Sequence, residues 1–448
     1  MHCRFFLFTL LLLSGITPAY GQADSTQPGS YAYNLANCIQ YGLAHQNDVV
    51  NARLDVQFSQ EQIKEVTGKF LPHVNVNGSL IDNLKLQTSV IPDIANRNYD
   101  KKIPVQFGTK WSSGVTGQVD QVVFNSDYFL GLKASRVYGD LSKKTYKRTE
   151  IDTRVAITKA YYAVLASEEN IRLAKANMVQ LKKTLADTKA RFDVGVAETV
   201  DVDRIQVSYN NVITDIETQI RLLVYATQLL KFQMGMPQEA QLTITETVKD
   251  LDVEAFVSDT IDYQVQDRIE YGIQTTQIAL NELSLKSKKM GYLPQLNAYV
   301  NYGVNYFAST FGDLYKTGYG ASALGLSLTW PIFAGTERLH QIREERITLK
   351  KSQNDLEYLT QQIKLDVANS NTEYLNNKSK YVTQKTNMGL TQGIYDRIVL
   401  KYQQGVATSL DVTLAESDLQ QAQVDYVQAL LLTLISKTEL DKAMGKIK

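Results

Sequence analysis

The chain has 448 residues, with 47 basic and 47 acidic side chains and a net charge of zero. This balance excludes a dedicated nucleic-acid-binding protein, which would carry a basic excess or a basic stripe. The mean hydropathy of −0.23 excludes a polytopic helical membrane protein. Only 8 residues are proline, so the composition permits long uninterrupted helices.

The first 21 residues are predicted to be a secretory signal peptide. Arg4 gives a short positive start, Phe5–Leu13 form an apolar run, and Ala19-Tyr20-Gly21 offers small residues at a cleavage site. The apolar run is about half as long as a membrane-spanning helix requires, and no later apolar run is long enough either. We therefore expect any membrane insertion to use β-strands. Cleavage would leave Cys38 as a lone thiol, expected to be buried as a small apolar side chain.

The sequence contains an internal repeat. RFDVGVAETVDV at 191–202 matches KYQQGVATSLDV at 401–412, and FLPHVNV at 70–76 matches YLPQLNA at 292–298. We therefore predict a tandem duplication in which each half runs helix, two strands, long helix, helix. The first half carries extra residues between its strands, around Ile91–Phe107. The predicted boundaries are 1–21 for the signal peptide, 22–236 for repeat 1, 237–267 for an inter-repeat or equatorial linker, and 268–448 for repeat 2.

Long helices are predicted in both halves. From about Gly131 to Phe192 no proline occurs, and apolar residues recur every seven positions, a period typical of coiled-coil packing. Such a helix of roughly 62 residues would span about 90 Å. Shorter helices are predicted at about 36–69 and 200–233, so one long helix would lie beside two shorter ones stacked end to end. The rows are Ile157, Val164, Ile171, Met178, Leu185 and Phe192, and in the duplicate Val367, Tyr374, Tyr381, Met388, Tyr395 and Tyr402. A solvated dimeric coiled coil is the alternative interpretation.

Four segments between the predicted helices alternate between apolar and polar residues, at 73–80, 111–124, 296–307 and 319–333. Most are longer than a typical globular strand and rich in aromatic residues, as in outer-membrane strands. An ordinary antiparallel sheet packed on another element is the alternative. Four strands cannot close a barrel, and lipid tolerates no free sheet edge. We therefore expect a barrel shared between several chains.

The LP-led strand starts, the Pro331-Ile332-Phe333 element before a long helix and the two Gly-Val…Asp-Val turns together resemble the TolC-like outer-membrane efflux protein (outer-membrane factor) family. The resemblance covers nearly all of the mature chain. It implies an α+β membrane protein that forms a homotrimeric 12-stranded β-barrel, with four strands per protomer, continued by a long periplasmic α-helical barrel. The location would be the outer membrane of a Gram-negative bacterium.

The resemblance further implies a passive exit duct of a tripartite efflux pump or type I secretion system. Its partners would be two further copies of the chain, a periplasmic adaptor, an inner-membrane transporter and outer-membrane lipid. Drug efflux, metal efflux and protein secretion all use such a duct, so the cargo stays open. An exported coiled-coil scaffold or adhesin without a pore is the competing function. It would explain the heptads but not the aromatic strands.

The two helix turns carry the residues to which the resemblance assigns roles. Gly195-Val196 and Gly405-Val406 match the periplasmic tips at which adaptor hairpins dock. Tyr402 matches a gate tyrosine. Asp411, with Asp201 as its repeat equivalent, matches an aspartate that rings the entrance constriction.

Each of these residues also has a purely structural interpretation. The glycines suit helix C-caps, Tyr402 is the last member of a tyrosine row, and Asp411 lies near a helix start, where aspartate is favoured. Two positions depart from the family pattern. Leu414 and Ala407 stand where the best-known family member has a second aspartate and a gate arginine.

No set of residues predicts an enzyme, a metal site or a cofactor site. The histidines are scattered, at positions 2, 45, 73 and 340, and no Cys/His metal spacing or phosphate-binding G-x-x-x-x-G-K-[ST] occurs. The adjacent carboxylates Glu168 and Glu169 lie on a predicted long helix and are interpreted as a solvated face. A periplasmic hydrolase therefore lacks a coherent catalytic set, and any energy for transport must come from a partner.

Overall fold

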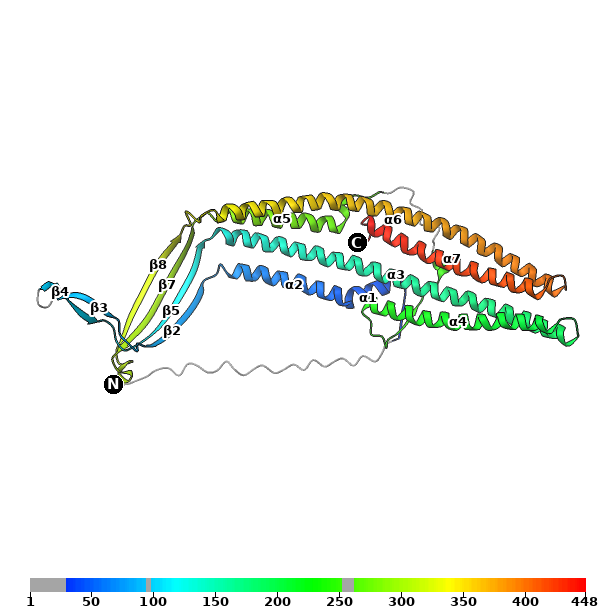
Figure 1. Ribbon diagram of the computed structural model, residues 1–448, viewed down its shortest axis with the longest axis horizontal. Helices are drawn as coiled ribbons and strands as arrows, with labels where there is room; N and C mark the ends of the chain where they lie inside the picture. The colour runs from blue at the N-terminus through cyan, green and yellow to red at the C-terminus, as the bar shows by residue number, and fades with distance from the viewer. Residues whose placement is uncertain (1–29, 94–97, 252–261) are drawn as a thin grey trace.

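The computed structural model describes residues 30–93, 98–251 and 262–448 as an elongated molecule with strands at one end and helices running to the other (Figure 1). The predicted signal peptide, and residues 252–261 of the predicted linker, lie outside the described residues. In the part of the chain that is described, none of the helices combines the length and the apolar character needed to cross a bilayer.

Seven α-helices, eight strands and three short 3-10 helices make up the regular structure of the described chain. The helices are α1 (Leu35–His45), α2 (Asn47–Gly68), α3 (Ser126–Asp193), α4 (Thr199–Met234), α5 (Ile269–Met290), α6 (Glu337–Gln403) and α7 (Ser409–Ala443). The strands are β1 (Ser30–Tyr33), β2 (His73–Asp82), β3 (Thr88–Asp93), β4 (Asn98–Gln106), β5 (Trp111–Phe124), β6 (Gln241–Ile244), β7 (Gln295–Ala308) and β8 (Gly318–Thr329).

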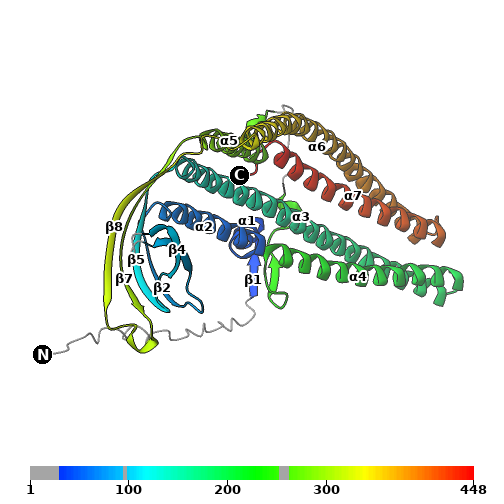
Figure 2. The same ribbon diagram turned by 60° about the vertical axis from the view of Figure 1, so that its left-hand side comes forward.

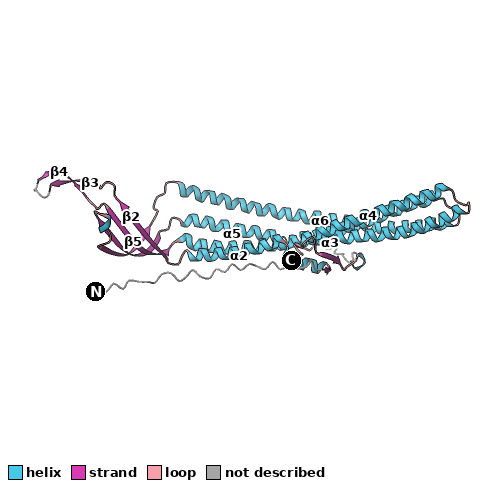
Figure 3. Ribbon diagram, turned by 90° about the horizontal axis from the view of Figure 1, so that it is seen from below, coloured by secondary structure: helices cyan, strands magenta, loops and turns pink. Residues whose placement is uncertain are grey.

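The two long helices, α3 with 68 residues and α6 with 67, each run from the sheet to the far end of the molecule. At 1.5 Å per residue each spans about 100 Å. Along α3, α2 and α4 follow one another, and along α6, α5 and α7 do the same (Figures 1 and 3). The expected arrangement of one long helix beside two shorter ones is therefore confirmed in both halves.

The predicted seven-residue rows form the buried seams of these helices. In α3 the buried members include Ile157 and Val164, and in α6 they include Tyr374, Tyr381 and Tyr395. Phe192 is the exception, because its side chain is 43% exposed next to the end of α3.

The opening helix, predicted as one element, is broken into α1 and α2 at Gln46. This residue adopts an extended backbone (ψ 131°), and its side chain accepts a hydrogen bond from Val49 N at 3.0 Å, which caps α2. The end of α4 packs against this junction so closely that a Cβ on Gly235 would lie 2.7 Å from His45 O. The break therefore accommodates a tertiary contact.

The main sheet is antiparallel with the order β2-β5-β7-β8. Its register aligns Val74, Val119, Val300 and Leu324 in one row across all four strands. The neighbouring row, whose side chains point to the opposite face, is Asn75, Gln118, Asn301 and Ala323. One face is therefore mainly apolar and the other mainly polar, as the alternation predicts.

The fourth strand is shorter than predicted, because β8 ends at Thr329 and the Pro331–Phe333 element lies outside it. Proline has no N–H to donate to a strand ladder. Trp330, just past the strand, instead donates its indole N–H to Tyr292 O at 3.1 Å.

The extra residues of the first half form a two-stranded hairpin, β3–β4, that projects beyond the main sheet (Figure 1). A second small sheet pairs β1 with β6 in parallel, at the middle of the molecule beside α1 and α3 (Figure 2). Cys38 lies in the apolar cluster beneath it, fully buried and free, as predicted. Burial, with a smaller contribution from the Glu246 charge, raises the pKa of Cys38 to about 12.

Candidate functional site

The helix tips lie at the end of the molecule farthest from the sheet, where α3 turns into α4 and α6 into α7 (Figure 1). Gly195 and Gly405 adopt left-handed conformations, with φ of 77° and 78°. At the second tip Gly405 N–H donates to Tyr402 O at 3.0 Å and Val406 N–H to Lys401 O at 2.9 Å, the Schellman pattern of helix ends. Both glycines therefore act as C-caps. The valines that follow them, at positions 196 and 406, are 73% and 75% exposed.

Asp411 caps the start of α7. Its Oδ2 accepts hydrogen bonds from the backbone N–H and the hydroxyl of Thr408, both at 2.8 Å. These two bonds, the backbone one first, lower the pKa of Asp411. The equivalent Asp201 accepts from Glu198 N at 3.1 Å at the start of α4. Both aspartates therefore stabilise a helix start, in agreement with their structural interpretation.

Asp201 also joins the two tips. Its Oδ1 accepts a hydrogen bond from Ser409 Oγ at 2.5 Å, and Arg204 Nη1 donates to the same hydroxyl oxygen at 2.7 Å. The Ser409 bond is the main reason that the pKa of Asp201 is lowered. The aspartates thus differ, since Asp201 is committed to α7 whereas the Asp411 side chain is exposed.

Tyr402 is buried between α6 and α3, with 6% of its surface exposed. Its hydroxyl lies 3.0 Å from Thr188 Oγ1, and Thr188 donates its own proton to Thr184 O at 2.8 Å. Tyr402 must therefore be the donor to Thr188. This bond ties the last turn of α6 to the last turns of α3.

Arg191 strengthens that tie, and sequence reasoning missed it. Its Nη1 donates to Tyr402 O at 2.7 Å, its Nη2 donates to Gln403 O, and its guanidinium lies 5.5 Å from the centre of the Tyr402 ring. The cation beside Tyr402 therefore comes from α3, whereas position 407 is an alanine that packs against the neighbouring apolar cluster. The one signal in the sequence was that Arg191 opens the repeated motif, where the second copy has Lys401.

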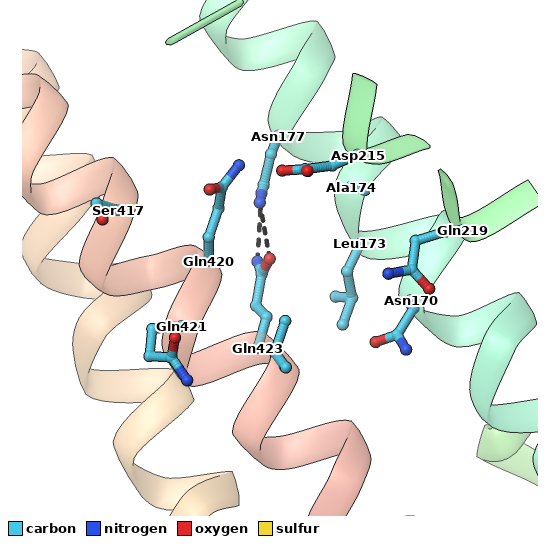
Figure 4. A pocket seen from close by; sticks show the side chains of 11 residues that line it. Asn170, Leu173, Ala174, Asn177, Asp215, Gln219, Ser417, Gln420, Gln421 and Gln423 are labelled. Atoms are coloured by element: carbon cyan, nitrogen blue, oxygen red, sulfur yellow. Dashed lines mark hydrogen bonds between the residues drawn. The ribbon is translucent and has the colours of Figure 1, made fainter. Parts of the chain in front are cut away.

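Farther from the tips, a polar cavity of about 280 Å³ lies between α3, α4 and α7. At its wall the side-chain amides of Asn177 and Gln423 are buried and exchange two hydrogen bonds, of 2.7 and 3.2 Å (Figure 4). Asp215 and Gln219 reach the cavity from α4, and Gln420 reaches it from α7. The amide pair fixes α3 against α7 without any net charge.

The described residues hold no group of three or more His, Cys, Asp or Glu side chains placed to bind a metal ion. The tips present helix caps, cross-helix hydrogen bonds and exposed apolar side chains.

Comparisons with known proteins agree with this arrangement. The sequence matches the family described as outer membrane efflux protein over residues 38–216 and 281–446, more than half of the chain. It is 21% identical to outer membrane protein TolC of Vibrio cholerae serotype O1, over 93% of this chain and 92% of that protein. It is 19% identical to the alkaline protease secretion protein AprF of Pseudomonas aeruginosa, over 70% of this chain and 67% of that protein.

Among solved structures, the fold is similar to that of CusC, whose conformational changes accompany folding and transmembrane channel formation. The TM-score is 0.72 at 14% identity, over 94% of this chain and 95% of that chain. Together with the family match, the duplicated helices and the two-faced sheet lead to one conclusion. The chain is an outer-membrane protein that belongs to the outer membrane efflux protein family.

Proposed function

We propose that three copies of this chain form a passive exit duct of a tripartite efflux or secretion machine. The observation that carries the proposal is the main sheet, which has an exposed, mainly apolar face and a mainly polar opposite face. Among the described residues, the outer edges of its terminal strands β2 and β8 are unpaired. A lipid-exposed sheet cannot keep free edges, so β2 of one copy must pair with β8 of the next. Three copies give a barrel of 12 strands with the polar face inward.

The helices would continue this barrel as a periplasmic tunnel. With the sheet in the outer membrane, the tips at Gly195 and Gly405 reach about 100 Å into the periplasm, given the length of α3 and α6. In this arrangement residues 1–21 are the removed export signal, 22–236 and 268–448 are the two repeats, and 237–267 is the equatorial linker.

The tips would receive the periplasmic adaptor. Val196 and Val406 are exposed apolar side chains beside glycines that have open space around them, which suits packing of a partner's helical hairpin. The duct itself would have no catalytic role, and an inner-membrane transporter would supply the energy for transport.

The entrance gate would consist of Tyr402, Asp201 and Asp411. Tyr402 and Asp201 hold the α6–α7 hairpin against α3 and α4 through Thr188 and Ser409. Asp411, exposed on its cap, is the carboxylate free to face its counterparts in two other copies. Position 414 is a leucine and offers no carboxylate, so a second carboxylate ring is not part of this proposal.

Cross-linking and conductance test the proposal together. Single cysteines on β2 and β8 should form disulfides between copies and give a covalent trimer on denaturing gels. Cys38 will not interfere, because it is fully buried with a pKa raised to about 12. The purified trimer should form channels in planar bilayers. A dimer without conductance would instead support the coiled-coil scaffold, and a monomer that fails to insert would refute the duct.

A further inference from the structure

Two polar groups are buried without partners near the tips. Glu416 of α7 is 5% exposed and Tyr395 of α6 is 2% exposed. Neither Glu416 Oε1 nor Tyr395 Oη has a hydrogen-bond partner in the described chain. Burying an ionised carboxylate without a cation or donor is strongly unfavourable. The packed helices therefore favour a neutral Glu416.

The charges around Glu416 act in the same direction. Burial, with the negative charge of Asp215 on α4 as a second cause, raises the pKa of Glu416 to about 7. Across the helix pair, the pKa of Tyr395 is raised by burial first and then by the charges of Glu416 and Asp396. Among the described residues no basic side chain pairs with Glu416. Burial between the helices and the charge of Asp215 on α4 thus both disfavour the ionised form of Glu416.

The position of this cluster connects it to the contacts between the hairpins. Tyr395 lies two turns before Tyr402 on α6 and shares its apolar cluster. Gln420, one turn after Glu416 on α7, lines the polar cavity together with Asp215 (Figure 4). Glu416 therefore lies where α7 meets α4 and α6, between the amide-lined cavity and the Tyr402 tie.

We propose that Glu416, together with the neighbouring charge of Asp215, forms a proton-binding site whose deprotonation loosens the α6–α7 hairpin from α3 and α4. The coupling to opening rests on the proposed duct, but proton binding does not. A neutral Glu416 packs between the helices. An ionised Glu416 is stabilised by water, which reaches it when the helices separate.

Proton binding is tested by unfolding the purified protein in detergent with denaturant and monitoring the loss of helix by circular dichroism. The pH dependence of the unfolding free energy then reports the proton that the folded state binds. The folded state binds the Glu416 proton more tightly than the unfolded state does. The stabilisation by this proton is therefore complete at low pH and is lost as the pH rises through about 7. Between pH 5.5 and 8.5 the unfolding constant of the wild type should rise roughly thirtyfold more than that of Glu416→Gln. The exposed Asp418→Asn on the same helix is the matched control and should behave as the wild type. Parallel pH profiles for wild type and Glu416→Gln would overturn the site.

Asp215→Asn guards against a Glu416 variant that fails to fold, because Asp215 is exposed. It removes the like charge, so the pH midpoint of the wild-type transition should move to lower pH. An unmoved midpoint would remove Asp215 from the site.

Conductance in planar bilayers then tests the coupling. Open probability should rise with pH through about 7 in the wild type and not in Glu416→Gln. Comparing these two proteins cancels every titration that they share. A pH-dependent stability without pH-dependent opening would overturn the coupling alone. Absence of conductance in the wild type would refute the duct, while the unfolding curves still report on the proton site.

Discussion

Replacing Gly405 with alanine is expected to destabilise the protein only modestly. Its φ of 78° lies in the left-handed region, which costs a residue with a Cβ about 1–2 kcal/mol. No heavy atom lies within 4 Å of the position that the added Cβ would take, so steric repulsion adds nothing. Gly195, with φ of 77° and the same open space, should respond equally.

Gly235 is the matched contrast, because it ends a helix with a similar φ of 68° but in a packed place. Its Cβ would lie 2.7 Å from His45 O and 2.8 Å from Gln46 Cα, and neither backbone atom can rotate away. Overpacking of this kind costs a further 1–3 kcal/mol or so. Gly235→Ala should therefore lose about 2–5 kcal/mol in total.

Denaturant unfolding of the three alanine variants measures these differences. Gly405→Asn then separates folding from docking, because asparagine tolerates the left-handed conformation while it adds a side chain at the tip. That variant should stay close to wild-type stability and trimerise, yet cross-link less to the adaptor. Equal losses for Gly405→Ala and Gly235→Ala would refute the reasoning that the tips are unpacked. Unchanged adaptor cross-linking by Gly405→Asn would refute docking there.

Three further outcomes follow from the contacts between helices. Tyr402→Phe should cost about 0.5–1.5 kcal/mol in unfolding experiments and raise open probability in bilayers, whereas Tyr395→Phe, which removes a hydroxyl without a partner, should cost nothing. Asn177→Ala should cost about 1–3 kcal/mol because it strands the buried Gln423 amide, and a double leucine replacement of the pair should recover most of that loss. The stabilisation that Asp411 gives is present above its unfolded pKa and lost as pH falls through its lowered folded pKa, so the stability difference between wild type and Asp411→Asn should shrink below about pH 4.

The long helices could be predicted from the sequence because local signals agree over many turns. No proline interrupts 131–192, the seven-residue row persists, and Gly195 stands where the helix must end. The main-sheet strands could also be located from the sequence. Apolar and polar residues alternate from Val74 and Asn75 onward, and in the paired strands they lie on opposite faces of the sheet. In these elements propensity, periodicity and turn chemistry all favour the same structure.

Elements set by tertiary contacts could not be predicted in the same way. The Gln46 side chain caps α2, but the break itself was not predicted, and the close approach of Gly235 from α4 accounts for the extended backbone there. The sequence showed extra residues at the place of the β3–β4 hairpin but did not predict their pairing. Pro92 and Pro104 cannot donate to a strand ladder, which argues against strands there. Proline also misled at the end of β8, where Pro331 was included in a strand that stops at Thr329.

At the tips, the repeat located the residues but not their partners. The offset between Gly195 and Gly405 points to both turns, and to Asp201 and Asp411 beside them. Arg191 reaches the carbonyl of Tyr402 because α3 and α6 end side by side. The periodicity of the sequence does not predict this arrangement.

The duplication produces equivalent backbones with unequal side-chain contacts, and this inequality bears on how a duct of this kind would open. Arg191 with Tyr402, and Asp201 with Ser409, both tie the α6–α7 hairpin to α3 and α4. By contrast, the hydrogen bonds that Asp411 Oδ2 accepts come from Thr408, at the start of its own helix α7. In the proposed duct, opening by the α6–α7 hairpin would break these charge-assisted hydrogen bonds, each worth about 1.5–3 kcal/mol, and separate the apolar cluster that Leu185 and Ile205 form with Tyr395 and Val412. Shifting such an equilibrium from mostly closed to mostly open takes about 5.5 kcal/mol, which an adaptor that binds the tips more tightly in the open state can supply.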